Sequence, residues 1–256
     1  MDQRIGAQFY TIRKNLETIE GFEDACRKVS EIGYKIIQIS GTPLPAKEMR
    51  EVCDKYGLEV VTSHKGFSDF ENNIDEVIEY NKTLGCKLCG VGSMPTEYAE
   101  SNEKVSEFIK KSSKIADDLK KEGMLFGYHN HSFEFIKYDG KRIIDRLIEE
   151  TDPEIYNFIV DTYWIQVGGC VPQEYIEKLG KRAMAVHFKD LKMQLKEFWC
   201  PRIAEVGNGN LDWDKIIKAC ETAGTKWALV EQDSCEGDPF DSLKISYDYL
   251  IQKGFK

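Results

Sequence analysis

Two hydrophobic patterns alternate along the whole chain. Short apolar runs of strand length are each followed by a longer stretch in which apolar residues recur every three or four positions, as on one face of a helix. The strand-like runs cover residues 4–10, 35–40, 59–64, 88–93, 124–130, 156–161, 183–188 and 227–232. The helical patterns lie near residues 21–32, 45–56, 71–84, 101–122, 142–150, 172–180, 213–223 and 239–253.

This alternation predicts a (β/α)8 TIM barrel. An open doubly wound sheet usually has fewer strands, and no Gly-x-Gly-x-x-Gly motif follows the first strand-like run. No linker or change of composition divides the 256 residues, so we expect one domain over residues 1–256. In such a barrel the catalytic groups lie at the C-terminal ends of the strands.

Charge and composition exclude several classes of partner. The net charge is -9 with acidic and basic residues interspersed, which disfavours nucleic acid and anionic membranes. The eight cysteines are scattered, and Cys86 and Cys89 lack the second pair that a structural zinc site needs, so we expect reduced thiols. No signal-peptide core and no apolar run of roughly 20 residues is present, which predicts a cytoplasmic protein.

Chemically versatile residues gather at the predicted strand ends. All four histidines lie there, namely His64, His129, His131 and His187. Asp161 and Glu231 end the apolar sixth and eighth strands. The helices that follow them are expected only near residues 172 and 239, too far downstream for either acid to cap a helix. We therefore expect both acids to belong to a site at the barrel mouth.

Four of these strands predict a metal site. Glu134, Asp161, His187 and Glu231 would converge from strands five to eight. Three carboxylates packed together repel one another strongly unless a cation lies between them. A set of mostly hard oxygen ligands suits Mn²⁺ best, with Mg²⁺, Co²⁺ and Zn²⁺ as alternatives.

Several motifs carry a family resemblance. They are Gly6-Ala-Gln-Phe-Tyr-Thr-Ile-Arg13, Tyr128-His-Asn-His-Ser-Phe-Glu-Phe135, Asp161-Thr-Tyr-Trp164 with Gly168-Gly169, Val186-His-Phe-Lys-Asp190, Glu205-Val-Gly-Asn-Gly-Asn-Leu-Asp-Trp213 and Val230-Glu-Gln-Asp233. Together they resemble the sugar phosphate isomerase/epimerase superfamily of xylose-isomerase-like barrels. This superfamily includes ketose 3-epimerases, inosose dehydratases and 3-keto-glycoside lyases.

The resemblance implies a divalent metal held by acid, acid, histidine and acid from strands five to eight, with a sugar bound to it. Strand five departs from this pattern, because His129 stands where the epimerases carry a glutamate. The fourth ligand is therefore Glu134 or His129, and the preference of hard ions for oxygen favours Glu134.

The resemblance also implies proton abstraction next to a carbonyl, through an enediolate. Epimerases of this kind use two metal-bound glutamates. Here Glu231 would provide one group, and His129 or His131 the other. The predicted function is a metal-dependent sugar or cyclitol isomerase or epimerase. The alternatives are a lyase or dehydratase of the same superfamily and a sugar-binding barrel without metal, whereas a DNA-repair endonuclease is disfavoured by the acidic charge.

The resemblance and strand positions also predict substrate contacts and a partner surface. The expected substrate-binding residues are Gln8, Tyr10, Arg13, His64, Trp164, Lys189 and Glu205. For Lys189 the alternative is a salt bridge at the rim with Asp190 or Glu205. Phe67 could also pack against the sugar ring. We expect segment 192–212 to form a loop whose Phe198, Trp199 and Cys200 serve either a homo-oligomer or related subunit, or a lid.

Overall fold

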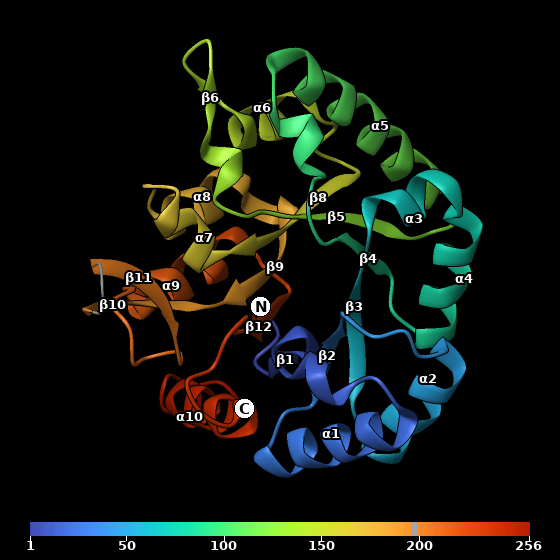
Figure 1. Cartoon of the computed structure of the whole chain (residues 1–256), viewed down its shortest axis with the longest axis vertical. Helices are drawn as coiled ribbons and strands as arrows, with labels where there is room; N and C mark the ends of the chain where they lie inside the picture. The colour runs from blue at the N-terminus through green and yellow to red at the C-terminus, as the bar shows by residue number, and fades with distance from the viewer. Residues whose placement is uncertain (196–198) are drawn as a thin grey trace.

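A closed barrel of eight parallel strands forms the centre of the structure, with helices around it (Figure 1). The computed structural model describes residues 1–195 and 199–256. The barrel strands are β1 Ile5–Gln8, β2 Ile36–Ile39, β3 Glu59–Lys65, β4 Leu88–Val91, β5 Leu125–His129, β8 Tyr156–Asp161, β9 Ala183–Phe188 and β12 Trp227–Val230. Each overlaps one of the predicted runs, so the predicted (β/α)8 TIM barrel is confirmed.

The helices cover the outside of the barrel. They are α1 Ile19–Ile32, α2 Ala46–Lys55, α3 Phe67–Asn72, α4 Ile74–Leu84, α5 Asn102–Lys121, α6 Ile143–Glu150, α7 Thr162–Val167, α8 Pro172–Leu179, α9 Trp213–Ala223 and α10 Pro239–Gln252. Short 3-10 turns are η1 Phe9–Asn15, η2 Thr96–Ala99, η3 Phe133–Phe135 and η4 Gly180–Arg182. Helix α5 shows why these segments are helical: the Ser101 hydroxyl caps it by accepting from Lys104 N, and Val105, Phe108 and Ile109 are buried at helical spacing.

The interior of the barrel is closed below the mouth by a small apolar cluster. Ile36, Val61, Leu88, Ile159 and Leu229 pack there from strands on all sides of the barrel. Because this layer fills the bottom, the polar residues at the C-terminal strand ends form a mouth above it rather than a pore.

Helix α7 was not expected from the sequence, which predicted no helix directly after Asp161. It begins directly after Asp161, whose Oδ1 accepts a hydrogen bond from Trp164 N at 2.9 Å, so this acid does cap a helix. The helix has only six residues, too few to show a helical period in the sequence. The cap uses only one oxygen of Asp161, and the other, Oδ2, lies near Lys189 and His129.

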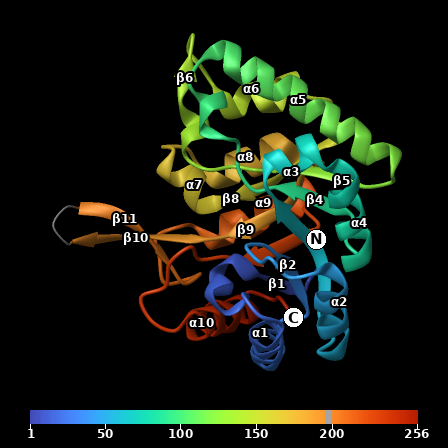
Figure 2. The same cartoon turned by 45° about the vertical axis from the view of Figure 1, so that its right-hand side comes forward.

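Segment 192–212 also differs from the loop that the sequence predicted. Instead of a loop, β10 Asp190–Leu195 and β11 Trp199–Ala204 pair as an antiparallel hairpin that projects from the barrel (Figure 2). Met193 and Leu195 are exposed on it. Phe198 and the side chain of Trp199 lie outside the described part, so the expected apolar surface there stays a prediction. A smaller hairpin joins β6 Lys137–Tyr138 to β7 Lys141–Arg142.

Two further expectations concern cysteines and membranes. All eight cysteines lie within the described residues and are free thiols. Among the helices of residues 1–195 and 199–256, none combines the length and apolar character needed to cross a membrane.

Candidate metal centre

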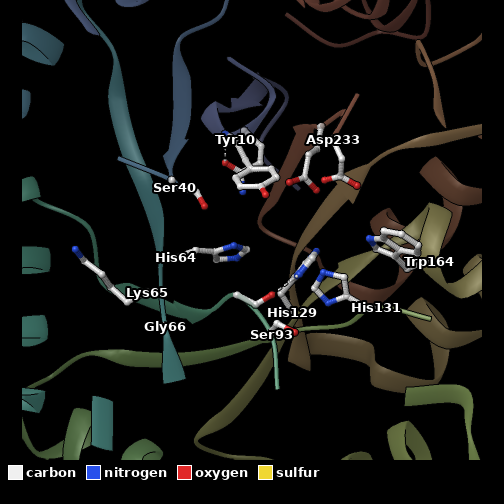
Figure 3. Close-up of a pocket in the computed structure, with 14 residues that line it drawn as sticks. Tyr10, Ser40, His64, Lys65, Gly66, Ser93, His129, His131, Trp164 and Asp233 are labelled. Carbon is white, nitrogen blue, oxygen red and sulfur yellow. Dashed lines mark hydrogen bonds between the residues drawn. The ribbon is translucent and has the colours of Figure 1, made fainter. Parts of the chain in front are cut away.

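A cavity of about 530 Å³ opens at the C-terminal face of the barrel (Figure 3). Its volume is within the range of about 300–1,000 Å³ that is usual for small-molecule sites. The residues that line it come from most of the strand ends: Gln8, Tyr10, Ser40, Gly41, His64, Lys65, Gly66, Gly92, Ser93, His129, His131, Trp164, Glu231 and Asp233.

Four buried side chains form a cluster, and two of them, His129 and Glu231, line this cavity. His129, Asp161, His187 and Glu231 each offer one nitrogen or oxygen, and these four atoms lie within 4.8 Å of one another. They come from the ends of β5, β8 and β9, and from the residue after β12. These strands are neighbours in the barrel, in the order β12-β9-β8-β5, which brings residues more than a hundred positions apart to one point.

Hydrogen bonds fix the tautomers of both histidines. His129 Nδ1 lies 2.9 Å from Gly92 O, and His187 Nε2 lies 2.6 Å from Gln38 Oε1. Because both partners are carbonyl oxygens, each imidazole donates its proton outward and keeps an inward lone pair. Within residues 1–195 and 199–256 the inward nitrogens form no hydrogen bond of good geometry, although His187 Nδ1 is 2.8 Å from Glu231 Oε2. Such converging lone pairs are typical of metal ligands.

The charges of the cluster also fit a divalent cation. Lys189 is completely buried, and its Nζ lies 3.2 Å from Asp161 Oδ2, 3.2 Å from Glu231 Oε2 and 2.7 Å from Asp233 Oδ2. Burial raises the pKa of Glu231, but Lys189 and His187 outweigh it and hold that pKa well below its usual range. When Asp161, Glu231 and Asp233 are all ionised, these carboxylates and the Lys189 ammonium leave a charge of -2, which one divalent ion would balance.

Glu134, predicted as the fourth ligand, lies apart from these four side chains. It lies in η3, where Oε1 accepts from the Tyr128 hydroxyl at 2.5 Å and Oε2 accepts from His131 N at 2.9 Å. The tight turn after β5 directs the carboxylate into the barrel wall. His129 has the strand-five place among the four side chains, so a metal held there would have two imidazole nitrogens and two carboxylates as possible ligands. This set suits Mn²⁺, Co²⁺ or Zn²⁺ better than Mg²⁺.

Two more imidazoles face the cavity in neutral form. His131 packs between Phe133 and Trp164, and burial lowers its pKa to about 3. Burial, together with the neighbouring His129 and His187, lowers the pKa of His64 well below its usual value. The His64 ring fits because Gly90 lies beside it: a Cβ there would be 2.5 Å from His64 Cδ2.

The predicted substrate-binding residues divide into two groups. Gln8, Tyr10, His64 and Trp164 line the cavity. Arg13, Lys189 and Glu205 do not. The Arg13 guanidinium donates to Tyr10 O and Asp233 O and stacks over the Tyr10 ring, so it fastens two loops together. Glu205 accepts a hydrogen bond from the Ser242 hydroxyl instead.

The contacts of Lys189 and Phe67 also differ from those expected. Lys189 pairs with neither Asp190 nor Glu205, since its ammonium lies inside the cluster. Asp190 instead accepts from Gly207 N, Gly209 N and the Trp213 indole, and thereby closes the loop after the β10–β11 hairpin. Phe67 packs against Tyr98 and Phe108 and is absent from the cavity lining.

Sequence reasoning missed Gln38, Ser40 and Asp233 as site residues. Gln38 interrupts an apolar strand, Ile36-Ile-Gln-Ile39, and this polar residue at a buried position was the available signal. Asp233 follows Glu231 by two positions beyond the end of β12, and both residues line the cavity.

Comparisons with known proteins agree with this architecture. The family model of the xylose isomerase-like TIM barrel matches residues 26–252. An inosose dehydratase of Geobacillus kaustophilus is 25% identical over 269 residues, covering 87% of this chain and 84% of that protein. One from Lacticaseibacillus casei is 22% identical and covers 90% of this chain and 88% of that protein.

A solved structure shares the fold over nearly its full length. The sugar phosphate isomerase/epimerase from Parabacteroides distasonis superimposes with a TM-score of 0.80 at 23% identity, covering 98% of this chain and 99% of that one. From the barrel and the extent of the family match, this chain belongs to the xylose isomerase-like TIM barrel family.

Proposed function

We propose that this protein is a lyase that eliminates a β-oxygen from a keto sugar or keto cyclitol, with a divalent metal held by His129, Asp161, His187 and Glu231. The observation that carries this proposal is the distribution of carboxylates in the cavity. Glu231 and Asp233, which line it, come from the same strand end, whereas β5 opposite contributes only imidazoles because Glu134 is turned away. Figure 3 shows Asp233 across the cavity from His129 and His131.

This arrangement suits elimination better than epimerisation. Epimerisation needs a base on one face of the substrate carbon and an acid on the other. A syn elimination needs both on one face, which Glu231 and Asp233 provide. Burial raises the pKa of Asp233 above its usual value, whereas Lys189 and His187 hold the pKa of Glu231 low. Glu231 is therefore the base and Asp233 the acid.

The proposed reaction balances without another reactant. Glu231 takes the proton from the carbon next to the ketone, and its electron pair forms a carbon–carbon double bond as the β carbon–oxygen bond breaks. Asp233 gives its proton to the departing oxygen. A bound divalent ion would act as a Lewis acid toward the ketone. His64 and His131 offer neutral nitrogens to substrate hydroxyls, and Trp164 walls the cavity.

The resemblance to inosose dehydratases supports this reaction type, since loss of water from a keto cyclitol is such an elimination. Epimerisation is the second candidate. His131 favours it, because this neutral imidazole lines the same cavity as Glu231 and could exchange a proton with the other face of the substrate carbon.

One experiment separates the two functions. Mn²⁺-loaded protein is incubated in D₂O with inosose and, separately, with D-fructose, and the products are followed by NMR. We expect inosose to lose water. In Asp233→Asn, deuterium exchange next to the ketone should continue while water loss falls by about 10²-fold or more. Asp241→Asn, at an exposed position on α10, is the matched control. A ketose epimerised with no loss of water from inosose would contradict the proposal.

A further inference from the structure

A second hollow lies beside the catalytic cavity, between η1 and the loop that joins β12 to α10. It has a volume of about 320 Å³, and its lining includes Arg13 and Lys14 of η1 and Asp233, Ser234 and Cys235 of the loop. We call it the Arg13 hollow. Of the residues described, only Asp233 lines both this hollow and the catalytic cavity. The Arg13 hollow is therefore a separate pocket.

Two cations line this hollow, and neither forms an ion pair with a carboxylate within residues 1–195 and 199–256. The Arg13 guanidinium donates to the carbonyl oxygens of Tyr10 and Asp233, at 2.9 and 3.0 Å. These two bonds fix its direction and leave its other N–H groups free, and the neutral carbonyls do not cancel its charge. Lys14 is the next residue along η1 and is exposed. A guanidinium held in this way is suited to bind an anion through two parallel hydrogen bonds.

The acids of the loop after β12 are engaged elsewhere. Asp233 Oδ2 lies 2.7 Å from the ammonium of Lys189. Glu236 pairs with Lys192 on the β10–β11 hairpin, at 3.2 Å. Asp238 caps α10 with its side chain. The two cations of η1 are thus the charges that the hollow offers to a ligand, in a chain whose net charge is -9.

The other polar groups of the hollow are neutral. Burial raises the pKa of the Cys235 thiol, which therefore stays protonated. Ser234 and Asn15 contribute a hydroxyl and an amide to the lining. Glu205, an acid that acts on Cys235 without lining the hollow, accepts a hydrogen bond from the Ser242 hydroxyl. Hydrogen-bond donors therefore accompany the two positive charges.

This combination identifies the class of ligand. An apolar group would leave the guanidinium without a partner, and a neutral sugar would leave both charges unbalanced. A carboxylate brings one charge and two oxygens, whereas a phosphate brings a charge of about -1.5 to -2 at pH 7 and three acceptor oxygens. Two cations with several spare N–H groups match the phosphate better.

We propose that the Arg13 hollow binds a phosphate-bearing ligand that is distinct from the reacting sugar. Arg13 would bind its oxygens in the fixed direction, and Lys14 would balance the second charge. Inorganic phosphate and a small phosphate ester share this chemistry. The site does not depend on the proposed elimination. Through Arg13 the ligand would lie against the loops that carry Tyr10 and Asp233, two residues of the catalytic cavity.

Calorimetric titration of the metal-loaded full-length protein tests the site. The probes are inorganic phosphate, glucose 6-phosphate and, as the neutral match, glucose. We expect at least one of the phosphates to bind roughly tenfold more tightly than glucose. Arg13→Gln should remove most of this preference and Lys14→Met part of it. Lys47→Met, at an exposed lysine on α2, should keep it.

A phosphate can also bind to the metal, and a variant of the catalytic cavity separates the two places. Trp164→Ala changes the lining of that cavity alone and should leave phosphate affinity unchanged. If Trp164→Ala weakens phosphate binding as much as Arg13→Gln does, the phosphate lies in the catalytic cavity and the inference is overturned.

Equal affinity for glucose and both phosphates also overturns it, as does a preference that survives both Arg13→Gln and Lys14→Met. Thermal melts show whether each variant is folded, and Lys14→Met, at an exposed position, decides the case if Arg13→Gln is not. Tighter binding of inorganic phosphate supports the site with the free anion as its ligand, and tighter binding of glucose 6-phosphate supports it with an ester.

Discussion

The side-chain oxygen of Gln38 lies 2.6 Å from Nε2 of His187, across the barrel from β2 to β9. This contact decides which ring nitrogen carries the proton and leaves the Nδ1 lone pair toward Asp161, Glu231 and His129. Gln38 is itself completely buried, so its amide is held in place.

Replacing Gln38 by Leu should weaken the binding of a divalent metal by about 10–100-fold, because the His187 tautomer is no longer fixed. Competition against a fluorescent chelator measures this affinity. Gln252→Leu, at the exposed end of α10, serves as the control. Unchanged affinity in a folded Gln38→Leu protein would show that this hydrogen bond does not orient a ligand.

Metal removal should lower the melting temperature. The acids around Lys189 keep a net negative charge without a divalent ion, and an ion that binds only to the folded state stabilises that state. At a metal concentration of about 100 times Kd the gain is about 2.7 kcal/mol, or about 5–10 °C for a domain of this size. Differential scanning calorimetry after EDTA treatment and after metal addition tests this.

The order of affinities is a separate expectation. Two imidazole ligands should give Zn²⁺ > Co²⁺ > Mn²⁺, with Mg²⁺ weakest. The same titrations rank the ions. If Mg²⁺ stabilised the protein most, the metal ligands would have to be mainly oxygen atoms, which would contradict a site with two imidazole ligands.

Glu134 should make stability depend on pH. Burial raises the pKa of its carboxyl from 4.5 to about 7, partly offset by the hydrogen bond from Tyr128. The folded state therefore binds more protons than the unfolded state in this window, and stability falls as pH rises from about 4.5 to about 7, by about 3 kcal/mol in total. The Glu134→Gln variant should not show this decrease in stability with rising pH.

Urea unfolding at about pH 5 and about pH 8 measures the effect. The free energy of unfolding of Glu134→Gln minus that of the parent protein should increase with pH, while exposed Glu48→Gln shows no such trend. Metal affinity should be unchanged in Glu134→Gln, because the residue lies outside the cluster. A large loss of metal affinity would restore Glu134 as a ligand.

Asp190 should be a major contributor to stability. Its buried carboxylate accepts from Gly207 N, Gly209 N and Leu211 N and from the Trp213 indole. Asp190→Asn replaces an acceptor by a donor there, and we expect a loss of about 2–4 kcal/mol in urea unfolding. Asp214→Asn breaks only an exposed pair with Lys253 and should cost less than about 1 kcal/mol. Equal losses in the two variants would contradict this view of Asp190.

The alternation of apolar runs was enough to predict the barrel, because strand and helix periods are local properties of the chain. It also placed His129, Asp161, His187 and Glu231 at strand ends, and parallel strands of one barrel bring such ends together. Helix α7 escaped prediction because six residues are too few to show a period.

What only the tertiary structure decided is the direction and environment of side chains beyond the strands. Glu134 and His129 were both candidates for the strand-five ligand. The backbone of η3 turns Glu134 into the barrel wall, whereas His129 lies in the cluster. Gln38 and His187 are 149 positions apart, and Lys189 meets three acids from two other strands. Sequence periodicity determines which residues reach the barrel mouth, whereas barrel closure and the turns after each strand determine which of their atoms meet.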